Sequence, residues 1–349
     1  MERDEKQQHD NDEPLFIREA VVKELLSWND CVDALESALV AATNSNKSAD
    51  KPFSSQTPRT FTPVPGKGVL LSMPGFIGNY PLQTVTGNER HSTLACKLVT
   101  SFSGNSKLNP PLPSILATIL MFNADTGRLK AIVDGTEITA WRTAAVSLVA
   151  TKHLYYSSRR FNSSNDYTLA ICGTGAQGRI HAIGMLTYFP NFFSKLNLWN
   201  RTKSRAVKLR DELNKLFPGL TIAVLDNSTD CVNDADVIVT ATNSSTPLFG
   251  KNDLRKSSVH INAIGAGTNH HSELALDIYQ SGSVFIESNL GIQTELKGIE
   301  AYVKGEIGEV IKDEQRRDNS EKISVFQSMG NALEDGVMAN LIYQKFIRL

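Results

Sequence analysis

The stretch at residues 167–178, YTLAICGTGAQG, constrains the fold of this chain more than any other. β-Forming residues at 168–172 are followed by Gly173, Gly175 and Gly178 in the order GxGxxG, and a helical pattern begins directly afterwards. Strand, glycine turn and helix in this order form a dinucleotide site. The glycines permit a tight turn, a close approach of the backbone to a pyrophosphate, and close packing of the helix, whose first N–H groups bind phosphates. The alternative is a glycine-rich loop that only joins two buried elements.

Composition narrows the class of protein. A chain of 349 residues that is 41% hydrophobic has enough apolar material for two domains with large cores. The formal net charge of −1 gives no electrostatic case for binding nucleic acid or a membrane surface. No apolar run approaches the roughly 18 residues that span a bilayer. The four cysteines show no CxxC spacing, so we expect reduced thiols, a cytoplasmic location and no metal site.

Two patterns of elements divide the chain. Residues 1–14 are polar and are expected to form a solvated tail, whereas residues 15–153 contain strands joined by hairpin turns, which predict an antiparallel sheet. Over residues 158–321, short apolar strands alternate with helices, the pattern of a doubly wound parallel sheet. Residues 322–349 are assigned to the first domain, with one amphipathic helix over 326–347. We therefore predict an α/β protein with a Rossmann domain and a second, α+β domain.

The second predicted strand of the parallel sheet ends in LWNRT at residues 198–202. An NAD site places a carboxylate there to accept hydrogen bonds from the ribose 2′-hydroxyl, and this segment has none. Asn200, Arg201 and Thr202 offer hydrogen-bond donors instead, and an arginine suits the 2′-phosphate of NADP. We therefore predict NADPH rather than NADH as the cofactor. A helix N-cap at Thr202 beside a solvated Arg201 would explain the same residues without a cofactor.

NLWNRTKSRA after GTGAQG resembles the ornithine cyclodeaminase and mu-crystallin family of dinucleotide-binding proteins. CKLVTSF at 96–102 is similar to that family's strand with an active-site lysine, and DGTEITAWRTAAVS at 134–147 to its helix with an active-site arginine. HINAIGAG at 260–267 is similar to its last cofactor-facing strand and loop, and the C-terminal FQSMGNALEDGVMANLIYQ to its closing helix. The resemblance extends from Leu15 to Phe346, which is nearly the whole chain.

The resemblance implies a two-domain subunit that forms a homodimer. The first domain would supply the dimer contact and one wall of the substrate site, and the Rossmann domain would hold the cofactor. The residues expected to bind the cofactor are Gly173, Gly175, Ala176, Gln177, Gly178, Asn200, Arg201, Thr202, Thr143, Ala241, Thr242, Ile264 and Gly265.

Three cations stand at motif positions of the family: Arg59 in PRTFTPV, Lys97 in CKLVT and Arg142 in WRTAA. Each lies in an otherwise apolar segment, and a buried cation needs a partner. A small carboxylate substrate would be that partner, and Lys97 is the best candidate to pass a proton because burial lowers the pKa of a lysine. Glu295 falls where the family carries a glutamate near the active site. Structural ion pairs, and an ordinary surface glutamate, are the alternatives.

One departure from the family changes the expected reaction. Two residues after NAIG at 262–265, cyclodeaminases and the related alanine dehydrogenases carry an aspartate where this chain has Gly267. The mu-crystallin branch also lacks it, and that branch is associated with NADPH-dependent ketimine reduction and thyroid hormone binding. The resemblance therefore implies reduction of the C=N bond of a cyclic imine, a ketimine that carries a carboxylate. The alternatives are an ornithine cyclodeaminase or amino-acid dehydrogenase, and a protein that binds NADPH and a thyroid-hormone-like ligand without turnover.

Three aromatic or imidazole side chains near these motifs carry weaker expectations. His270 and His271 could serve as acid–base residues, but their loop departs from the family, so we expect no direct role for them. Trp141 precedes Arg142 and is expected to pack, with a role in shaping the substrate pocket as the alternative.

Overall fold

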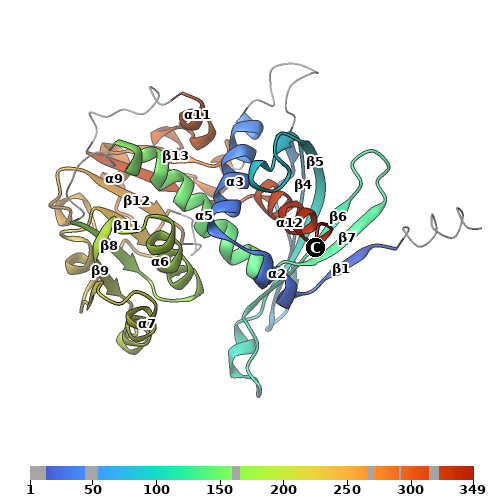
Figure 1. The fold of residues 1–349 in the computed structure, drawn as a ribbon. Helices are drawn as coiled ribbons and strands as arrows, with labels where there is room; N and C mark the ends of the chain where they lie inside the picture. The colour runs from blue at the N-terminus through green and yellow to red at the C-terminus, as the bar shows by residue number, and fades with distance from the viewer. Residues whose placement is uncertain (1–12, 44–53, 159–165, 266–270, 291, 314–321) are drawn as a thin grey trace, which may run out of the picture. The chain divides into compact units, whose positions relative to one another are not determined.

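The computed structural model describes residues 13–43, 54–158, 166–265, 271–290, 292–313 and 322–349 (Figure 1). The chain forms two compact units. The first consists of Met1–Arg142 with Asn331–Leu349, and the second of Thr143–Gly330. The sequence placed the first domain at 15–153 and 322–349, so the observed first unit is shorter at both boundaries.

A mixed sheet forms the framework of the first unit. Its strands are β1 (Leu15–Ile17), β2 (Ser54–Gln56), β3 (Thr60–Val64), β4 (Gly68–Pro81), β5 (Arg90–Ser101), β6 (Ile115–Phe122) and β7 (Leu129–Asp134). The order is β1-β7-β6-β5-β4-β2, and β3 also pairs with β4. Strand β1 runs parallel to β7, and the other pairings are antiparallel. The predicted antiparallel sheet is confirmed, with its hairpin closed by the pair Val64 and Gly68.

Helix α12 (Ala332–Phe346) lies against this sheet and is buried along most of its length. A Cβ atom on Gly75 in β4 would lie 2.9 Å from the Cβ of Ala332, and one on Gly336 would lie 3.4 Å from the Cβ of Ala95 in β5. Small residues therefore bring the helix close to the strands. The Asn331 side chain caps the helix by accepting a hydrogen bond from the N–H of Glu334 at 3.0 Å.

The other helices of the first unit are α2 (Glu19–Leu25), α3 (Trp28–Thr43), α4 (Gln83–Thr86) and the start of α5 (Thr136–Leu154). The packing role expected of Trp141 is confirmed, because its ring stacks on that of Trp28 with the centroids 4.0 Å apart.

The prediction of a single helix over 326–347 is wrong for the residues before Ala332. Residues Ile323–Gln327 form strand β15, and the helix begins only at Ala332. Strand β15 is parallel to β12 and β13 on either side, so its apolar side chains are buried by sheet packing. Phe326 is buried, as it would be in either a strand or a helix, so the hydrophobic pattern of this segment could not distinguish the two structures.

The second unit contains an eight-stranded parallel sheet. Its strands are β8 (Tyr167–Cys172), β9 (Phe193–Trp199), β10 (Thr221–Val224), β11 (Val237–Thr240), β12 (Val259–Ala263), β13 (Ser283–Ile286), β14 (Val303–Glu306) and β15. The order is β10-β9-β8-β11-β12-β15-β13-β14. The chain runs outward from β8 in one direction and then returns to β11 on its other side, as in a Rossmann domain. This confirms the predicted doubly wound sheet and places its switch point beside the glycine turn.

Helices of the second unit include the remainder of α5, α6 (Ala176–Tyr188), α7 (Lys203–Leu216), α8 (Ser228–Val232), α9 (Leu276–Ser281), α10 (Ile292–Glu295) and α11 (Ile307–Lys312). Among the residues that the structure describes, no helix is long and apolar enough to cross a bilayer.

Candidate cofactor site and buried charge cluster

The glycine turn has the geometry that the sequence predicted. Gly173 adopts a φ of +102°, and a Cβ atom there would lie 2.4 Å from the carbonyl oxygen of Ala241. A Cβ atom on Gly178 would lie 1.8 Å from the carbonyl oxygen of Gly173, so only glycine lets α6 sit this close to the turn. Gly175 instead faces open space, and no side chain caps the start of α6. The first N–H groups of this helix are therefore available to a phosphate.

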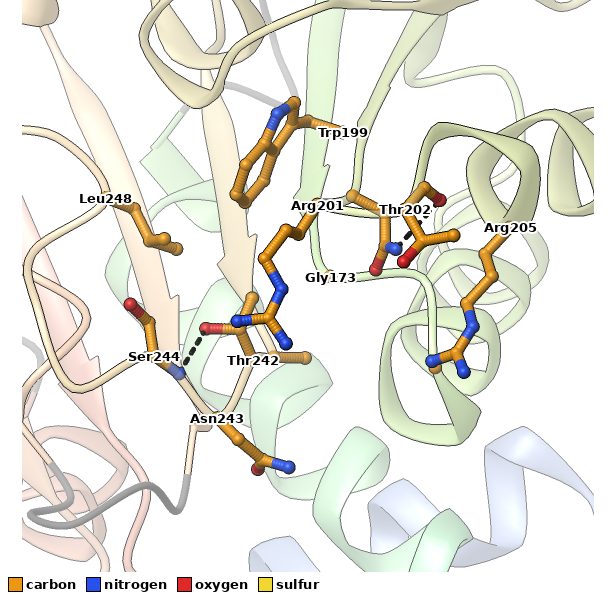
Figure 2. A pocket seen from close by; sticks show the side chains of 12 residues that line it. Gly173, Trp199, Arg201, Thr202, Arg205, Thr242, Asn243, Ser244 and Leu248 are labelled. Carbon is orange, nitrogen blue, oxygen red and sulfur yellow. Dashed lines mark hydrogen bonds between the residues drawn. The ribbon is translucent and has the colours of Figure 1, made fainter. Parts of the chain in front are cut away.

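A pocket of about 230 Å³ opens at this turn (Figure 2). Its lining comes from the glycine turn, the end of β9, the first turn of α7 and the loop after β11. The lining residues are Gly173, Gly175, Trp199, Asn200, Arg201, Thr202, Arg205, Ala241, Thr242, Asn243, Ser244 and Leu248. Seven of them were predicted to bind the cofactor.

The end of β9 forms a basic wall of this pocket. Asn200 accepts a hydrogen bond from the N–H of Thr174 at 3.1 Å and donates one to the carbonyl of Thr202 at 3.0 Å, which fixes the turn against the strand. Figure 2 shows Arg201 extending toward the Thr242 loop. Within the described ranges, Arg201 and Arg205 form no ion pair with an acidic side chain. Two guanidinium groups without an acidic partner in this part of the chain therefore lie beside the glycine turn.

A buried carboxylate that the sequence analysis missed joins two loops at the cofactor site. Glu273 is 1% exposed, and it accepts hydrogen bonds from the N–H and hydroxyl of Thr242 at 2.6 Å each and from the N–H of Gly265 at 2.8 Å. A Cβ atom on Gly265 would lie 2.2 Å from this carboxyl group. Burial raises the pKa of Glu273, while the hydrogen bonds oppose that shift. The sequence around Glu273, HSEL, does not indicate this role, because the hydrogen-bond donors to its carboxylate come from two other loops.

The remaining predicted cofactor residues lie outside the pocket lining. Thr143 is buried, and its carbonyl accepts a hydrogen bond from the Ser147 hydroxyl at 3.1 Å. Gln177 accepts one from His181 Nδ1 at 2.8 Å through its carbonyl, within α6. Ala176 and Gly178 belong to the first turn of α6, and Ile264 and Gly265 directly follow β12, which ends at Ala263.

Four charged side chains form a buried cluster within the first unit, between strand β5, helix α5 and helix α12. Lys97 Nζ lies 2.7 Å from Asp335 Oδ2. Arg142 Nη1 lies 2.9 Å from Glu334 Oε2, and Arg142 Nε lies 3.4 Å from Asp335 Oδ1. The structure therefore brings Lys97 and Arg142 together through the two carboxylates of α12. We use the term charge cluster for Lys97, Arg142, Glu334 and Asp335.

The secondary structure explains why these side chains meet. In β5 the side chain of Lys97 points to the same buried face as Ala95 and Val99, and α12 packs on this strand. Glu334 and Asp335 belong to the first turn of α12, where negative charge is favourable. The sequence analysis expected a substrate carboxylate to compensate the two cations. In the structure the side chains of Glu334 and Asp335 compensate them. The only sign of this arrangement in the sequence was that acidic pair within an otherwise apolar closing segment.

The charge cluster alters the pKa of its lysine. Burial lowers the pKa of Lys97 from its ordinary value of 10.5 to about 8. Asp335 opposes this shift, and the neighbouring Arg142 adds to it. Lys97 therefore titrates much closer to neutral pH than a surface lysine does.

Other predicted residues are less closely tied to these sites. Arg59 is half-buried between β2 and β3 in the first unit. Glu295 is half-buried at the end of α10 in the second unit. His271 forms a hydrogen bond with the carbonyl of Lys297 at 3.0 Å. Gly267 and His270 lie outside the described residues. The described part of the chain has no group of acidic, histidine or cysteine side chains arranged to bind a metal.

The parallel sheet, the glycine turn and the basic pocket define a dinucleotide-binding protein with a second, mixed-sheet unit. Residues 12–348 match the ornithine cyclodeaminase/mu-crystallin family, and the chain belongs to it.

Two curated relatives illustrate the family. The chain is 33% identical over 340 residues to the ketimine reductase mu-crystallin of Macropus fuliginosus, covering 95% of this chain and 98% of that protein. It is 31% identical over 316 residues to a Delta(1)-pyrroline-2-carboxylate reductase of Bacillus thuringiensis subsp. konkukian, covering 85% and 89%.

Solved structures share the fold across nearly the whole chain. The Thermococcus litoralis Delta(1)-pyrroline-2-carboxylate reductase in complex with NADH and L-proline has a TM-score of 0.77 at 24% identity, covering 96% of this chain and 98% of that one. The iminosuccinate reductase of Paracoccus denitrificans in complex with NAD⁺ has a TM-score of 0.73 at 23% identity, covering 96% and 97%.

Proposed function

We propose that this protein is an NAD(P)H-dependent oxidoreductase that reduces the C=N bond of cyclic imines carrying a carboxylate. The observation that carries the proposal is the pair Lys97 and Arg142, held 2.7–2.9 Å from carboxylates in the buried charge cluster of a chain that also has a cofactor pocket. The curated relatives named above are a ketimine reductase and a pyrroline-2-carboxylate reductase.

We assign cofactor binding to residues of the second unit and binding of the substrate carboxylate to residues of the first. The glycine turn and the start of α6 bind the pyrophosphate of the cofactor. When bound, the reduced nicotinamide supplies a hydride to the imine carbon. Arg142 and Lys97 bind the substrate carboxylate, since a guanidinium and an ammonium both make strong charge-assisted hydrogen bonds to it. Arg59 and Glu295 remain proposed contributors, the first as a further cation and the second to orient a water molecule or the imine nitrogen.

The preference for NADPH over NADH is part of the proposal. Arg201 and Arg205 line the pocket, no carboxylate follows β9 within it, and Lys203 alongside is already paired with Asp226. A 2′-phosphate would meet two guanidinium groups there, whereas a 2′-hydroxyl would leave them without a partner.

Homodimer formation and a cytoplasmic location are also proposed. Large apolar side chains are exposed on strands of the first unit, with Phe16 in β1 59% exposed and Phe61 in β3 60% exposed. An archaeal alanine dehydrogenase dimer with bound NAD has the same fold, with a TM-score of 0.74 at 22% identity. All four cysteines are free thiols, in keeping with a reducing compartment. Sedimentation equilibrium would measure the oligomeric state.

NADPH oxidation by the purified protein with five- and six-membered cyclic ketimine carboxylates tests the function. We expect oxidation with the ketimine and none with ornithine, and we expect Lys97→Ala to abolish turnover while NADPH binding by fluorescence is retained. Lys195→Ala, an exposed lysine of the second unit, is the matched control. Ammonia release from ornithine would contradict the proposal in favour of a cyclodeaminase. Tight NADPH binding without oxidation would favour a protein that only binds small molecules such as thyroid-hormone-like ligands.

A further inference from the structure

One wall of the cofactor pocket is the loop that follows β11. Residues 272–275, which we call the bracing segment, hold this loop near both of its ends. Near the start of the loop, the Ser272 hydroxyl donates a hydrogen bond to the carbonyl of Ser244 at 2.6 Å. Near its end, the N–H of Leu248 donates one to the carbonyl of Glu273 at 2.8 Å. The bracing segment therefore fixes a wall of the pocket from behind.

The bracing segment also places a carboxylate between the loops that follow β11 and β12. Glu273 Oε1 accepts hydrogen bonds from the N–H and the hydroxyl of Thr242 at 2.6 Å each, and Oε2 accepts one from the N–H of Gly265 at 2.8 Å. The Thr242 hydroxyl itself accepts a hydrogen bond from the N–H of Ser244 at 3.1 Å, so its own hydrogen points to the carboxylate (Figure 2). Three donors around two oxygens suit an ionised carboxylate, whereas an amide would turn its NH₂ group toward one of them.

Thr242 carries this contact to the glycine turn. A Cβ atom on Gly173 would lie 2.8 Å from Cγ2 of Thr242, so the start of the loop packs directly against the turn to which we assign the pyrophosphate. On the other side, a Cβ atom on Gly265 would lie 2.2 Å from the carboxyl group of Glu273. The contact between Thr242 and Glu273 is therefore enclosed by two glycines, and neither position has room for a side chain.

We propose that Glu273 is a positioning residue for the cofactor, which holds the loop after β11 in the conformation that receives the dinucleotide. The inference rests on the proposed function and deepens it. Glu273 is not one of the residues that line the pocket, and it acts through Thr242, which is. Because the loop is already ordered before the cofactor arrives, binding does not have to pay for ordering it. Loss of the carboxylate should lower affinity for the cofactor and leave the charge cluster of the first unit unaffected.

Fluorescence titration with NADPH tests this role without turnover, because it measures Kd and the number of binding sites separately. Glu273→Gln should raise the Kd for NADPH by about tenfold or more, since a donor at Thr242 or Gly265 loses its acceptor and meets an NH₂ group. In the assay with a cyclic ketimine, the KM for NADPH should rise in the same way. The KM for the ketimine at saturating NADPH should change by less than about twofold, since its carboxylate binds to the first unit.

Two further sets of variants serve as matched controls. Thr242→Val keeps the shape of the side chain without the hydroxyl and should raise the Kd by about five- to tenfold, whereas Thr242→Ser keeps the hydroxyl and should stay within about twofold of the wild type. Asp236 is also a buried carboxylate, 5% exposed, and it accepts a hydrogen bond from the N–H of Thr168 at 2.8 Å. It directly precedes β11, at the end of the strand opposite to Thr242. Asp236→Asn should therefore lower the free energy of unfolding without changing the Kd.

Two results would overturn the inference. One is a wild-type Kd in the Glu273→Gln variant, with only its free energy of unfolding or its number of binding sites reduced, since a purely structural role predicts that outcome. The other is an equal effect of Thr242→Val and Thr242→Ser on the Kd, which decides the question even if Glu273→Gln does not fold. Ketimine reduction with the Kd unchanged in every variant would contradict only the positioning role. The expected changes in Kd without NADPH oxidation by any ketimine would contradict only the proposed function.

Discussion

The glycine turn and the charge cluster both offer cations or N–H groups to an anion, yet the chain builds them differently. The turn draws its essential residues from one segment of twelve, and the two arginines beside it have no acidic partner within the described ranges. The cluster joins Arg142 to Glu334 across 192 positions of sequence, and both of its cations are already paired. An exposed phosphate site can leave its cations to water, whereas a buried site must carry its own counter-charges.

The largest effect should come from breaking the charge balance of the cluster. Asp335→Ala leaves Lys97 buried without its nearest anion and should lower the free energy of unfolding of the first unit by about 3–5 kcal/mol. Urea denaturation followed by circular dichroism would measure the loss. The double variant Lys97→Met with Asp335→Leu removes both charges and should recover most of it.

An exposed pair in the same unit supplies the control for that experiment. Arg348 Nη2 lies 3.4 Å from Glu89 Oε2, with side chains 41% and 56% exposed, so Glu89→Ala should cost about 1 kcal/mol or less. A loss for Asp335→Ala no greater than that of the control would mean that the cluster is far better solvated than its burial indicates.

A smaller effect is expected at the phosphate site, where water can replace a lost partner. Arg201→Asp should shift the ratio of kcat/KM for NADPH over NADH by about 10- to 100-fold toward NADH, since it removes a charge-assisted hydrogen bond and adds repulsion of the 2′-phosphate. Arg210→Asp makes the same charge change on α7, outside the pocket lining, and should leave the ratio nearly unchanged. An unaltered preference in Arg201→Asp would remove the basis for the predicted NADPH specificity.

The same contrast explains what could be predicted from the sequence. The turn at Gly173 and Gly178 is dictated by local backbone geometry, so twelve residues were enough to predict the strand, the turn and the helix. Lys97 and Arg142 were identified through family motifs, but their partners were not. Glu334 and Asp335 are buried only because α12 packs on β5, and no local pattern specifies that contact. Glu273 escaped notice for the same reason, because its partners come from two other loops.

The boundary of the closing helix was missed through a different ambiguity. Strand β15 has the sequence ISVFQ, and four of its five residues are buried because neighbouring strands and both faces of the parallel sheet cover it, so no strict alternation marks it as a strand. The apolar residues at the end of this strand fit the helical spacing of the apolar face of α12, so the predicted helix began too early. The strand's neighbours β12 and β13 are separated from it in sequence, and only the assembled sheet identifies it.

The smallest effect, and the one that most sharpens the comparison, is a pH dependence confined to the cluster. Lys97 has a folded pKa of about 8, so affinity for tetrahydrofuran-2-carboxylate, a ring carboxylate without a cationic nitrogen, should fall by about tenfold or less as the pH rises from about 7 to about 10, because Arg142 keeps its charge. This ligand does not titrate between about pH 7 and about pH 10, and the arginines of the phosphate site stay charged over that range. NADPH affinity should therefore remain nearly constant while affinity for the anion declines.

The sign of the accompanying stability change is opposite. Because burial lowers the pKa of Lys97 from 10.5 to about 8, the unfolded chain binds this proton between those values and the folded chain does not. The contribution of Lys97 to the free energy of unfolding therefore rises with pH across that window. Lys97→Arg keeps its charge throughout and should lose both dependences. A variant that retains the fall in anion affinity would show that a group other than Lys97 titrates in the cluster.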